Sequence, residues 1–480
     1  MLKIEILRNY LYSILSIFAQ YLYPIIILPY VLSIFDPNLF GLINYYENLS
    51  RYLLTLALFG IPQYAIREIS KSNMSNKLKK FRQLFTLHFI STLLFLIIYI
   101  VFVIFFLPKD FYNIKLIVIG ALIILSNLLL IEWFFIGTEK FKFLSYRLIF
   151  SRLVLIVVVF SFVKDVDDLE LFFLTNLIFN LLIGFFSIKE LLKDENFIFR
   201  FDFDFIDHIY PCVNIFLIAF FIQVYTVLDV VILGFFATAS QVGLYTLASK
   251  IIKIPIALFS ALTPVLMPKI SKSFKRNNVS KINILINSSI TFSVLFSIPI
   301  MTLIIIYSDY IILIFSNEKF LDASLYLQIL SPLVLIISLG NILVMQFMMS
   351  INKEKELVSI FFFTALISII LTLILVPELK ALGTVLTLLI VECIVLVLAI
   401  IKSKKYLQNL QLDFKLFLSA FIISIILGLL FSYIKSLIYY ELFFSLILIF
   451  LFLISYIFIL FLLNKHKLEN NLNTLKSMNE

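Results

Sequence analysis

The sequence predicts an all-α integral membrane protein with about 14 transmembrane helices, arranged as two pseudo-symmetric six-helix bundles plus two C-terminal helices. Three observations predict this fold: a hydrophobic content of 62%, long apolar runs separated by short polar loops, and positive charge that alternates from loop to loop. A chain this apolar, with a mean hydropathy of +1.10, is not a soluble globular protein. Because a bilayer core holds no water, the backbone must bond to itself there, and the apolar runs are expected to be helices.

The apolar runs define the individual spans. The expected segments are residues 9–35, 41–66, 82–107, 114–136, 146–163, 170–191, 211–236, 242–267, 285–306, 323–350, 357–377, 381–401, 414–433 and 441–463. The first run is long and has no small-residue cleavage site after it, so it is expected to be a retained span. The longest outer loop, at 307–322, is itself rather apolar, which leaves no extracellular domain to perform chemistry.

Basic residues indicate which side of the membrane each loop occupies. Of the 38 Lys and Arg residues, 29 lie in the chain ends and in alternate loops, including the stretch from Lys140 to Arg152, whereas the intervening loops hold six. The positive-inside rule places the rich loops and both termini in the cytoplasm. The net charge of +9 is then explained by loops that face anionic lipid, and it does not indicate nucleic acid.

The chain also contains an internal duplication. An offset of 202 residues superposes Gly41 on Gly243, Arg51 on Lys253 and Pro62 on Pro264. Six spans in each half make a parallel repeat about an axis along the membrane normal. Pro24, Pro29, Pro62 and Pro264 are expected to kink spans 1, 2 and 8.

The repeat predicts the domain organisation. The expected parts are a first bundle at 1–191, a cytoplasmic or interfacial linker at 192–210, a second bundle at 211–402, and two further helices with a tail at 403–480. Phe alternates with other residues from Phe197 to Phe205 in the linker. This pattern is typical of a strand, and a segment lying in the membrane interface is an equally good interpretation.

Arg51 is the first of three basic residues inside apolar segments. It lies about ten residues into span 2, near the middle of the membrane at ~1.5 Å per residue. A basic side chain there costs roughly 2.5–3.5 kcal/mol on insertion, so it is expected to face the interior. Two interpretations are open: a structural pair with Glu47, one turn earlier, or a central pathway in which Arg51 attracts an anionic substrate.

Lys250 and Lys253 lie three residues apart on span 8 and therefore share a helix face. Lys253 is too far from either end of the span for snorkelling to explain it well, whereas Asp229 on span 7 could neutralise Lys250. Because Arg51 and Lys253 occupy equivalent places, they predict a positive cleft at the midplane, where repeat-built transporters bind substrates. Guanidinium and ammonium groups suit phosphate.

Other polar residues inside the spans are less specific. Glu392, midway along span 12, could carry a proton or cation or simply tie helices together. Glu132 lies near the inner end of span 4, where the adjacent Trp133 fits an interfacial aromatic belt. Asn176 and Asn180 share a face of span 6 and predict interhelical hydrogen bonds.

Catalytic and metal-binding patterns are essentially absent from the sequence. The three histidines lack metal-ligand spacing, and no Gly-rich phosphate loop or nucleophile elbow occurs, so no cofactor or metal is expected. The acidic cluster at 165–168 could mimic the metal-sugar site of a membrane glycosyltransferase, although a solvated loop is the simpler explanation. Cys212 and Cys393 both lie in predicted spans, which argues against a disulfide framework.

Several motifs resemble a known family. They are the run Ile131-Glu132-Trp133-Phe134-Phe135-Ile136-Gly137-Thr138-Glu139-Lys140-Phe141, then Gly60-Ile61 with Arg67-Glu68-Ile69, and Leu228-Asp229, Val242-Gly243-Leu244-Tyr245 and Ala248-Ser249-Lys250. Their order and spacing resemble polysaccharide (O-antigen or capsule) repeat-unit flippases of the Wzx type. These proteins belong to the multidrug/oligosaccharidyl-lipid/polysaccharide exporter superfamily.

The resemblance implies a function and partners. It implies a flippase of the bacterial plasma (inner) membrane that moves an undecaprenyl-diphosphate-linked oligosaccharide by alternating access. Cationic cavity residues of such proteins could correspond to Arg51, Lys250 and Lys253, with Glu47, Asp229 and Glu392 as coupling or charge-pairing groups. A polymerase and a chain-length regulator are implied as partners. Alternatives are a peptidoglycan lipid-precursor flippase and a drug/cation antiporter of the same fold.

Overall fold

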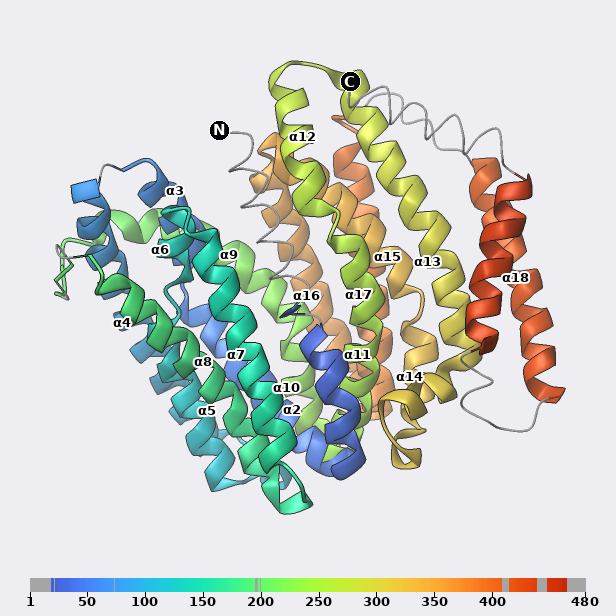
Figure 1. Ribbon diagram of the computed structural model, residues 1–480, viewed down its shortest axis with the longest axis horizontal. Helices are drawn as coiled ribbons and strands as arrows, with labels where there is room; N and C mark the ends of the chain where they lie inside the picture. The colour runs from blue at the N-terminus through green and yellow to red at the C-terminus, as the bar shows by residue number, and fades with distance from the viewer. Residues whose placement is uncertain are drawn as a thin grey trace. The chain divides into compact units, whose positions relative to one another are not determined.

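The computed structural model of the 480-residue chain describes residues 19–20, 22–72, 74–194, 197–198, 200–407, 414–437 and 447–463 (Figure 1). Within these ranges the regular elements are helices, and no strand occurs. Within the described ranges, eleven helices are long and apolar enough to cross a membrane, and the shorter apolar helices Leu22–Ile34 and Ile447–Leu463 lie within the first and last predicted spans. The all-α membrane fold is confirmed, whereas the total of 14 spans and the cytoplasmic termini stay predictions.

Backbone contacts divide the chain into two compact units. Unit 1 consists of Met1–Thr246 and Ser368–Thr384, and unit 2 of Leu247–Ile367 and Val385–Glu480. The bundles expected at 1–191 and 211–402 follow the sequence repeat rather than these contacts, and they stay a prediction.

Unit 1 is built from apolar helices that pack along their length. It contains α2 (Pro37–Ala57), α3 (Ile61–Ser70), α4 (Met74–Phe105), α5 (Ile114–Ser126), α6 (Glu132–Gly137), α7 (Phe141–Phe162), α8 (Leu169–Leu191), α9 (Ile206–Thr226), α10 (Leu228–Phe236) and the first turns of α11 (Ala239–Ser260). Helix α5 packs against α2, α4 and α8, and α7 packs against α8, as the blue to green ribbons show (Figure 1). Asn180 confirms its predicted interhelical bond, since its Nδ2 donates to Ser126 Oγ at 2.8 Å, whereas Asn176 Nδ2 donates to the carbonyl oxygen of Phe173 in its own helix at 3.4 Å.

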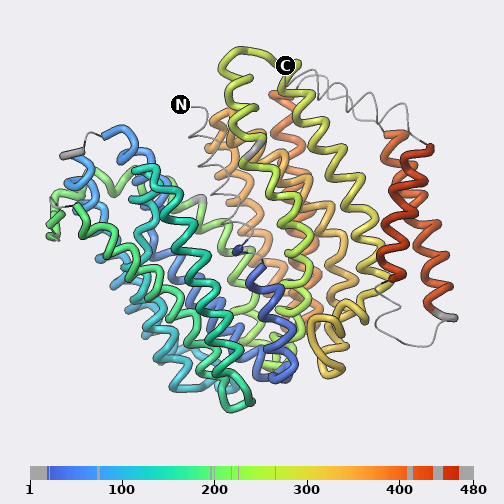
Figure 2. Tube along the Cα trace, in the orientation of Figure 1, coloured from blue at the N-terminus to red at the C-terminus, as the bar shows by residue number. Residues whose placement is uncertain are grey.

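Unit 2 is organised around one long helix. Its elements are α12 (Thr263–Lys275), α13 (Val279–Phe315), α14 (Ala323–Leu330), α15 (Leu333–Asn341), a π-helical turn (Ile342–Met348) and α18 (Phe414–Leu437), with parts of α16 (Glu354–Leu379) and α17 (Ala381–Ser403). Helix α18 runs beside α13 (Figure 2), where the hydroxyls of Thr302 and Ser424 lie 2.7 Å apart. The expected outer loop at 307–322 is wrong in its start, because α13 continues through a kink at Tyr307 as far as Phe315.

Spans 2 and 8 share the same break between two helices. Helices α2 and α11 begin at residues 37 and 239, and α3 and α12 begin at residues 61 and 263, so both pairs are offset by 202 residues. Pro62 and Pro264 lie in the first turns of α3 and α12. Backbone N–H groups of a first turn have no acceptor within the helix, so proline removes no helical hydrogen bond there. The predicted bends in the two spans are confirmed, and they are breaks between helices.

Helices α2 and α11 approach each other through two repeat-equivalent glycines in unit 1. A Cβ atom on Gly41 would lie 1.7 Å from the carbonyl oxygen of Ala239 and 2.8 Å from the nitrogen of Gly243. A Cβ atom on Gly243 would lie 2.1 Å from the carbonyl oxygen of Pro37. No side chain fits either position, so backbone packs on backbone at this crossing. By the predicted topology, both helices begin at the outer surface.

Candidate functional site

Arg51 belongs to a ladder of polar side chains along α2. Its Nη2 donates to Asn48 Oδ1 at 2.9 Å, and Asn48 Nδ2 in turn donates to the carbonyl oxygen of Asn44 at 2.7 Å. The Arg51 side chain is exposed, whereas both asparagines are buried. The ladder therefore orients an exposed cation near the middle of the predicted span, and its use as a substrate ligand stays a prediction.

Glu47 acts on a second cation, the half-buried Arg152, which the sequence interpretation placed in a cytoplasmic patch. The Arg152 guanidinium lies 4.5 Å from the ring centroid of Tyr23 and 4.1 Å from that of Phe179, and the charge of Glu47 acts on it. A hydrogen bond links Tyr23 to Thr175. Arg152 is 11 residues beyond the start of α7 at Phe141, roughly 16 Å along the helix axis, and so lies inside the membrane.

Lys253 and Glu392 come together in unit 2. Lys253 is exposed on α11, whereas Glu392 on α17 is only 9% exposed, and the charge of Lys253 acts on the Glu392 carboxylate. Lys250, one turn earlier on α11, is half-buried. A buried carboxylate needs a counter-charge, and the charge-pairing role of Glu392 stays a prediction. The use of Lys250 and Lys253 as substrate ligands stays a prediction.

Asp229 is buried in unit 1 and lies near the start of α10. Its carboxylate accepts hydrogen bonds from the hydroxyl of Tyr245 and from the backbone N–H of Val230 at 2.7 Å. Three of the six predicted site residues, Glu47, Arg51 and Asp229, thus lie in unit 1. Lys250, Lys253 and Glu392 lie in unit 2. The pairing of Asp229 with Lys250 stays a prediction.

The motif beginning at Glu132 is a packing element of unit 1. Trp133 is 1% exposed and stacks on Phe81, with ring centroids 5.4 Å apart, so its expected place in an interfacial belt is wrong. Gly137 allows close packing, because a Cβ atom there would lie 3.0 Å from the side chain of Ile69. Glu132 pairs with buried Arg147 at 2.6 Å, between Oε1 and Nη2. The motif therefore holds α6 against α3 and α7.

Substituting Glu132→Gln is expected to lower the stability of the protein by about 2 kcal/mol, because the 1% exposed Arg147 side chain loses its counter-charge. The exposed half of Glu132 limits this cost. Thermal unfolding of the detergent-purified protein measures it. Glu139→Gln removes an exposed carboxylate from the same segment and serves as the control. Equal unfolding temperatures for the two variants would show that the ion pair does not stabilise the fold.

The linker at 192–210 packs on α4 where the structure describes it. Phe197 contacts Phe81 and Phe201 contacts Phe89, with ring centroids 5.6 and 5.0 Å apart. The backbone N–H of Asp202 donates to Thr86 Oγ1 at 3.0 Å. Residues 200–205 have no regular secondary structure, so the described part of the linker is not a strand. Phe197 and Phe201 of the alternating run thus pack on a helix, whereas Phe203 is exposed.

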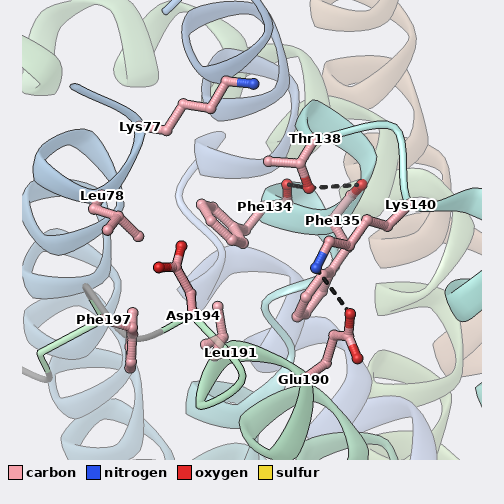
Figure 3. Close-up of a pocket in the computed structure, with 10 residues that line it drawn as sticks. All are labelled: Lys77, Leu78, Phe134, Phe135, Thr138, Lys140, Glu190, Leu191, Asp194 and Phe197. Atoms are coloured by element: carbon pink, nitrogen blue, oxygen red, sulfur yellow. Dashed lines mark hydrogen bonds and ion pairs between the residues drawn. The ribbon is translucent and has the colours of Figure 1, made fainter. Parts of the chain in front are cut away.

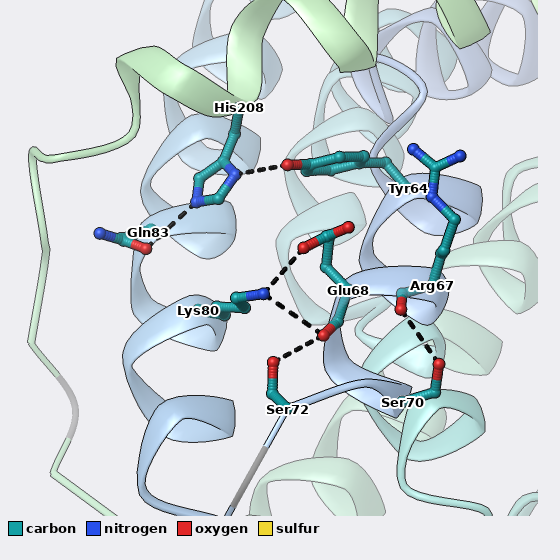
Figure 4. Close-up of polar contacts among 8 residues, drawn as sticks. All are labelled: Tyr64, Arg67, Glu68, Ser70, Ser72, Lys80, Gln83 and His208. Atoms are coloured by element: carbon teal, nitrogen blue, oxygen red, sulfur yellow. Dashed lines mark hydrogen bonds and ion pairs between the residues drawn. The ribbon is translucent and has the colours of Figure 1, made fainter.

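His208 connects the start of α9 to α3 and α4 (Figure 4). Its Nδ1 lies 2.8 Å from Tyr64 Oη, and its Nε2 lies 3.1 Å from Gln83 Oε1. Beside it, Lys80 Nζ donates to Glu68 Oε2 at 2.8 Å, and this hydrogen bond holds the pKa of Glu68 below its ordinary value, against the opposing effect of burial. The contacts of His208 fix the start of α9 against α3 and α4. Among the described residues, no group of His, Cys, Asp and Glu could hold a metal ion.

Comparisons with known proteins agree with this architecture. A family model described as Polysaccharide biosynthesis protein matches residues 6–274, more than half of the chain. The candidate O-antigen transporter of Escherichia coli (strain K12) is 26% identical over 412 residues, which cover 84% of this chain and 99% of that protein.

Solved structures show the same fold. Lipid II flippase MurJ in an inward closed conformation has a TM-score of 0.76 at 18% identity and covers 96% of this chain and 100% of that one. An inward-facing multidrug resistance MATE family transporter of the MOP superfamily has a TM-score of 0.62 at 11% identity, with 83% of this chain and 94% of that one covered. The resemblance seen in the sequence motifs is confirmed, and the chain belongs to the polysaccharide biosynthesis protein family.

Proposed function

We propose that this protein is a flippase that moves undecaprenyl-diphosphate-linked oligosaccharide repeat units to the outer leaflet of the bacterial plasma membrane. The family match and the Escherichia coli relative support transport of a glycan precursor. The observation that carries the proposal is the exposed cation Arg51 near mid-span on α2, with Lys253 exposed at the equivalent place on α11.

The charges of these residues suit the head group of such a lipid. A diphosphate carries negative charge on oxygens that guanidinium and ammonium groups bind strongly when water is excluded. Asn48 orients Arg51 by a 2.9 Å hydrogen bond, so less side-chain freedom is lost on binding. Lys250 adds a third positive charge on the face of α11 that carries Lys253.

The transport cycle has three steps in this proposal. Arg51, Lys250 and Lys253 capture the diphosphate from the cytoplasmic side, and the polyprenyl tail stays in lipid. The contact between Gly41 and Gly243 then opens at the outer ends of α2 and α11, while the inner side closes. The released repeat unit would be used outside by a polymerase with its chain-length regulator.

The carboxylates favour an anionic cargo over a cationic drug. An antiporter that binds cations needs carboxylates without counter-charges in its cavity. Here the charge of Glu392 is met by Lys253, and that of Glu47 acts on Arg152. The fold shared with MurJ leaves a peptidoglycan precursor as the second candidate, because that cargo is also a polyprenyl diphosphate.

Deleting the gene is expected to leave lipid-linked repeat units in the inner leaflet, since a charged sugar head group does not cross the hydrocarbon core unaided. The measurement is the accessibility of these sugars to an impermeant lectin or oxidant in spheroplasts, with and without a returned wild-type copy. Stalled peptidoglycan precursor in the same cells would favour the second candidate. Normal delivery of both lipids without the gene would contradict a flippase function.

A further inference from the structure

His208 lies at the start of α9, and the proposed transport cycle does not use it. One turn further along α9, a Cβ atom on Gly60 would lie 2.4 Å from the carbonyl oxygen of Cys212. The rings of Phe59 and Phe216 lie 5.1 Å apart at the same contact. Phe59 and Gly60 form the break between α2 and α3, where their φ angles are 50° and 70°. The first turns of α9 are therefore packed against the break in span 2.

The hydrogen bonds of His208 fit a neutral ring with its proton on Nε2. Gln83 Nε2 lies 3.5 Å from Asp204 Oδ2, which turns the amide oxygen of Gln83 towards His208. An amide oxygen only accepts hydrogen bonds, so His208 Nε2 donates, and Nδ1 accepts from the Tyr64 hydroxyl. Figure 4 shows the ring between these two partners. The neutral ring thus satisfies both of its nitrogens.

A second proton on the ring disrupts this arrangement. Nδ1 of an imidazolium is a donor, so the Tyr64 hydroxyl has to turn round and accept. Within the described part of the chain, that hydroxyl has no other hydrogen-bond acceptor for its own proton. Protonation of His208 therefore costs the site one hydrogen bond.

The charges around His208 do not compensate for this cost. Lys80 on α4 opposes a positive ring, whereas three carboxylates favour one, namely Glu68, Asp204 and Asp207. Glu68 is already engaged by Lys80 at 2.8 Å. Asp204 and Asp207 are exposed, so water and salt screen their charges. The neutral ring is therefore the form that fits the contact.

Nearby ion pairs do not respond to pH in the range where a histidine does. Lys140 Nζ lies 2.8 Å from Glu190 Oε1 (Figure 3), and Lys80 pairs with Glu68 (Figure 4). Ammonium groups and carboxylates keep their charges between about pH 5.5 and pH 8, whereas an ordinary imidazole changes its charge there. His208 is thus a group of this region that can sense cytoplasmic pH.

We propose that the hydrogen bonds of His208 to Tyr64 and Gln83 form a pH-sensitive latch, which holds the start of α9 against α3 and α4 and opens when the cytoplasm becomes acidic. An ordinary histidine titrates near pH ~6.5. The latch is therefore complete above that pH, and it weakens as the pH falls below it. Opening releases α9 from the break in span 2. The inference goes beyond the proposed function, because it concerns regulation by pH and holds whichever lipid is moved.

Cys212 is a built-in probe of the latch, since it is 0% exposed and lies one turn beyond His208 on α9. In the full-length purified protein with Cys393→Ser, its rate of reaction with dithiodipyridine is measured at about pH 8 and about pH 5.5, on either side of the ordinary histidine pKa. Each rate is divided by that of glutathione at the same pH, which removes the effect of pH on the thiol chemistry. The corrected rate is expected to rise roughly 2- to 13-fold in acid, the factor that the loss of one hydrogen bond supplies.

Two variants separate the latch from other effects of acid. His208→Asn keeps an acceptor for the Tyr64 hydroxyl and cannot gain a proton, so its corrected rate should stay low at both pH values. Tyr64→Phe removes the hydroxyl and should raise the rate at about pH 8 to near the acid rate of the unchanged chain. Tyr112→Phe is the matched control for the second variant, since it removes an exposed hydroxyl from a predicted outer loop and should change nothing.

Three results would overturn the proposal. An acid response that persists in His208→Asn would assign it to another group. A corrected rate that does not change with pH in the unchanged chain would show that acid does not release α9. Equal rates for Tyr64→Phe and Tyr112→Phe would show that the Tyr64 hydroxyl does not hold it. None of these measurements requires translocation, so failure of the latch and failure of the flippase function are distinguishable.

Discussion

Neutralising Arg51 and Lys253 together is expected to reduce translocation of lipid-linked repeat units at least about a hundredfold, because each cation contributes a charge-assisted bond of roughly 1.5–3 kcal/mol to the bound phosphate. The measurement is outer-leaflet delivery in cells that carry Arg51→Ala/Lys253→Ala as their only copy. Arg51→Lys/Lys253→Arg keeps both charges and should retain part of the activity. Lys319→Ala removes an exposed lysine from a predicted outer loop and should change nothing.

The charge pair in unit 2 requires a folding control for this experiment. Lys253 acts on the buried carboxylate of Glu392, so Lys253→Ala alone leaves that carboxylate without a counter-charge and is expected to destabilise the protein. Arg51→Ala/Lys253→Ala/Glu392→Gln removes the stranded charge as well. If this triple variant folds and still does not translocate, the loss belongs to substrate binding. Normal translocation by the folded triple variant would refute the cationic site.

The membrane fold could be predicted from the sequence because the bilayer constrains each segment only along the membrane normal. Apolar run length sets each span, and loop charge sets its direction, and neither requires knowledge of packing. The helix breaks near Pro62 and Pro264 were predicted for the same reason, since proline acts through its own backbone. The end of α13 at Phe315 was missed, because the sequence alone does not show whether an apolar stretch beyond the expected span continues the helix or forms a loop.

The site was only partly predictable, because a helix face shows nothing about what lies opposite it. Arg152 looked like the last basic residue of a cytoplasmic patch, yet the rings of Tyr23 and Phe179 enclose it. The available signal was its place in the apolar stretch of α7, five residues beyond Arg147. Asn48 carried no signal of its own, and only its 2.9 Å contact with Arg51 assigns it a role.

Replacing Gly41 by alanine is expected to impair closure of the outer side, because the new Cβ atom would lie 1.7 Å from the carbonyl oxygen of Ala239. Overpacking of this kind costs about 1–3 kcal/mol, which shifts the ratio of open to closed outer ends roughly 5- to 150-fold. Gly340→Ala is the matched control, since no atom lies within 4 Å of a Cβ atom at that helical position. Both variants raise helix propensity equally, so a difference between them reports the crossing of α2 and α11 and not the helix.

A cysteine at position 246 can report which end is open. Thr246 is 3% exposed and lies one turn inward from Gly243 on α11. In a background with Cys212→Ser and Cys393→Ser, an impermeant thiol reagent added outside should label Thr246→Cys slowly, and Gly41→Ala should accelerate that labelling. Gly340→Ala should leave the labelling rate unchanged. Because labelling depends only on access and translocation depends on the full cycle, faster labelling with reduced translocation would identify the glycine crossing as the outer gate. Unchanged labelling in Gly41→Ala would show that the two helices part elsewhere.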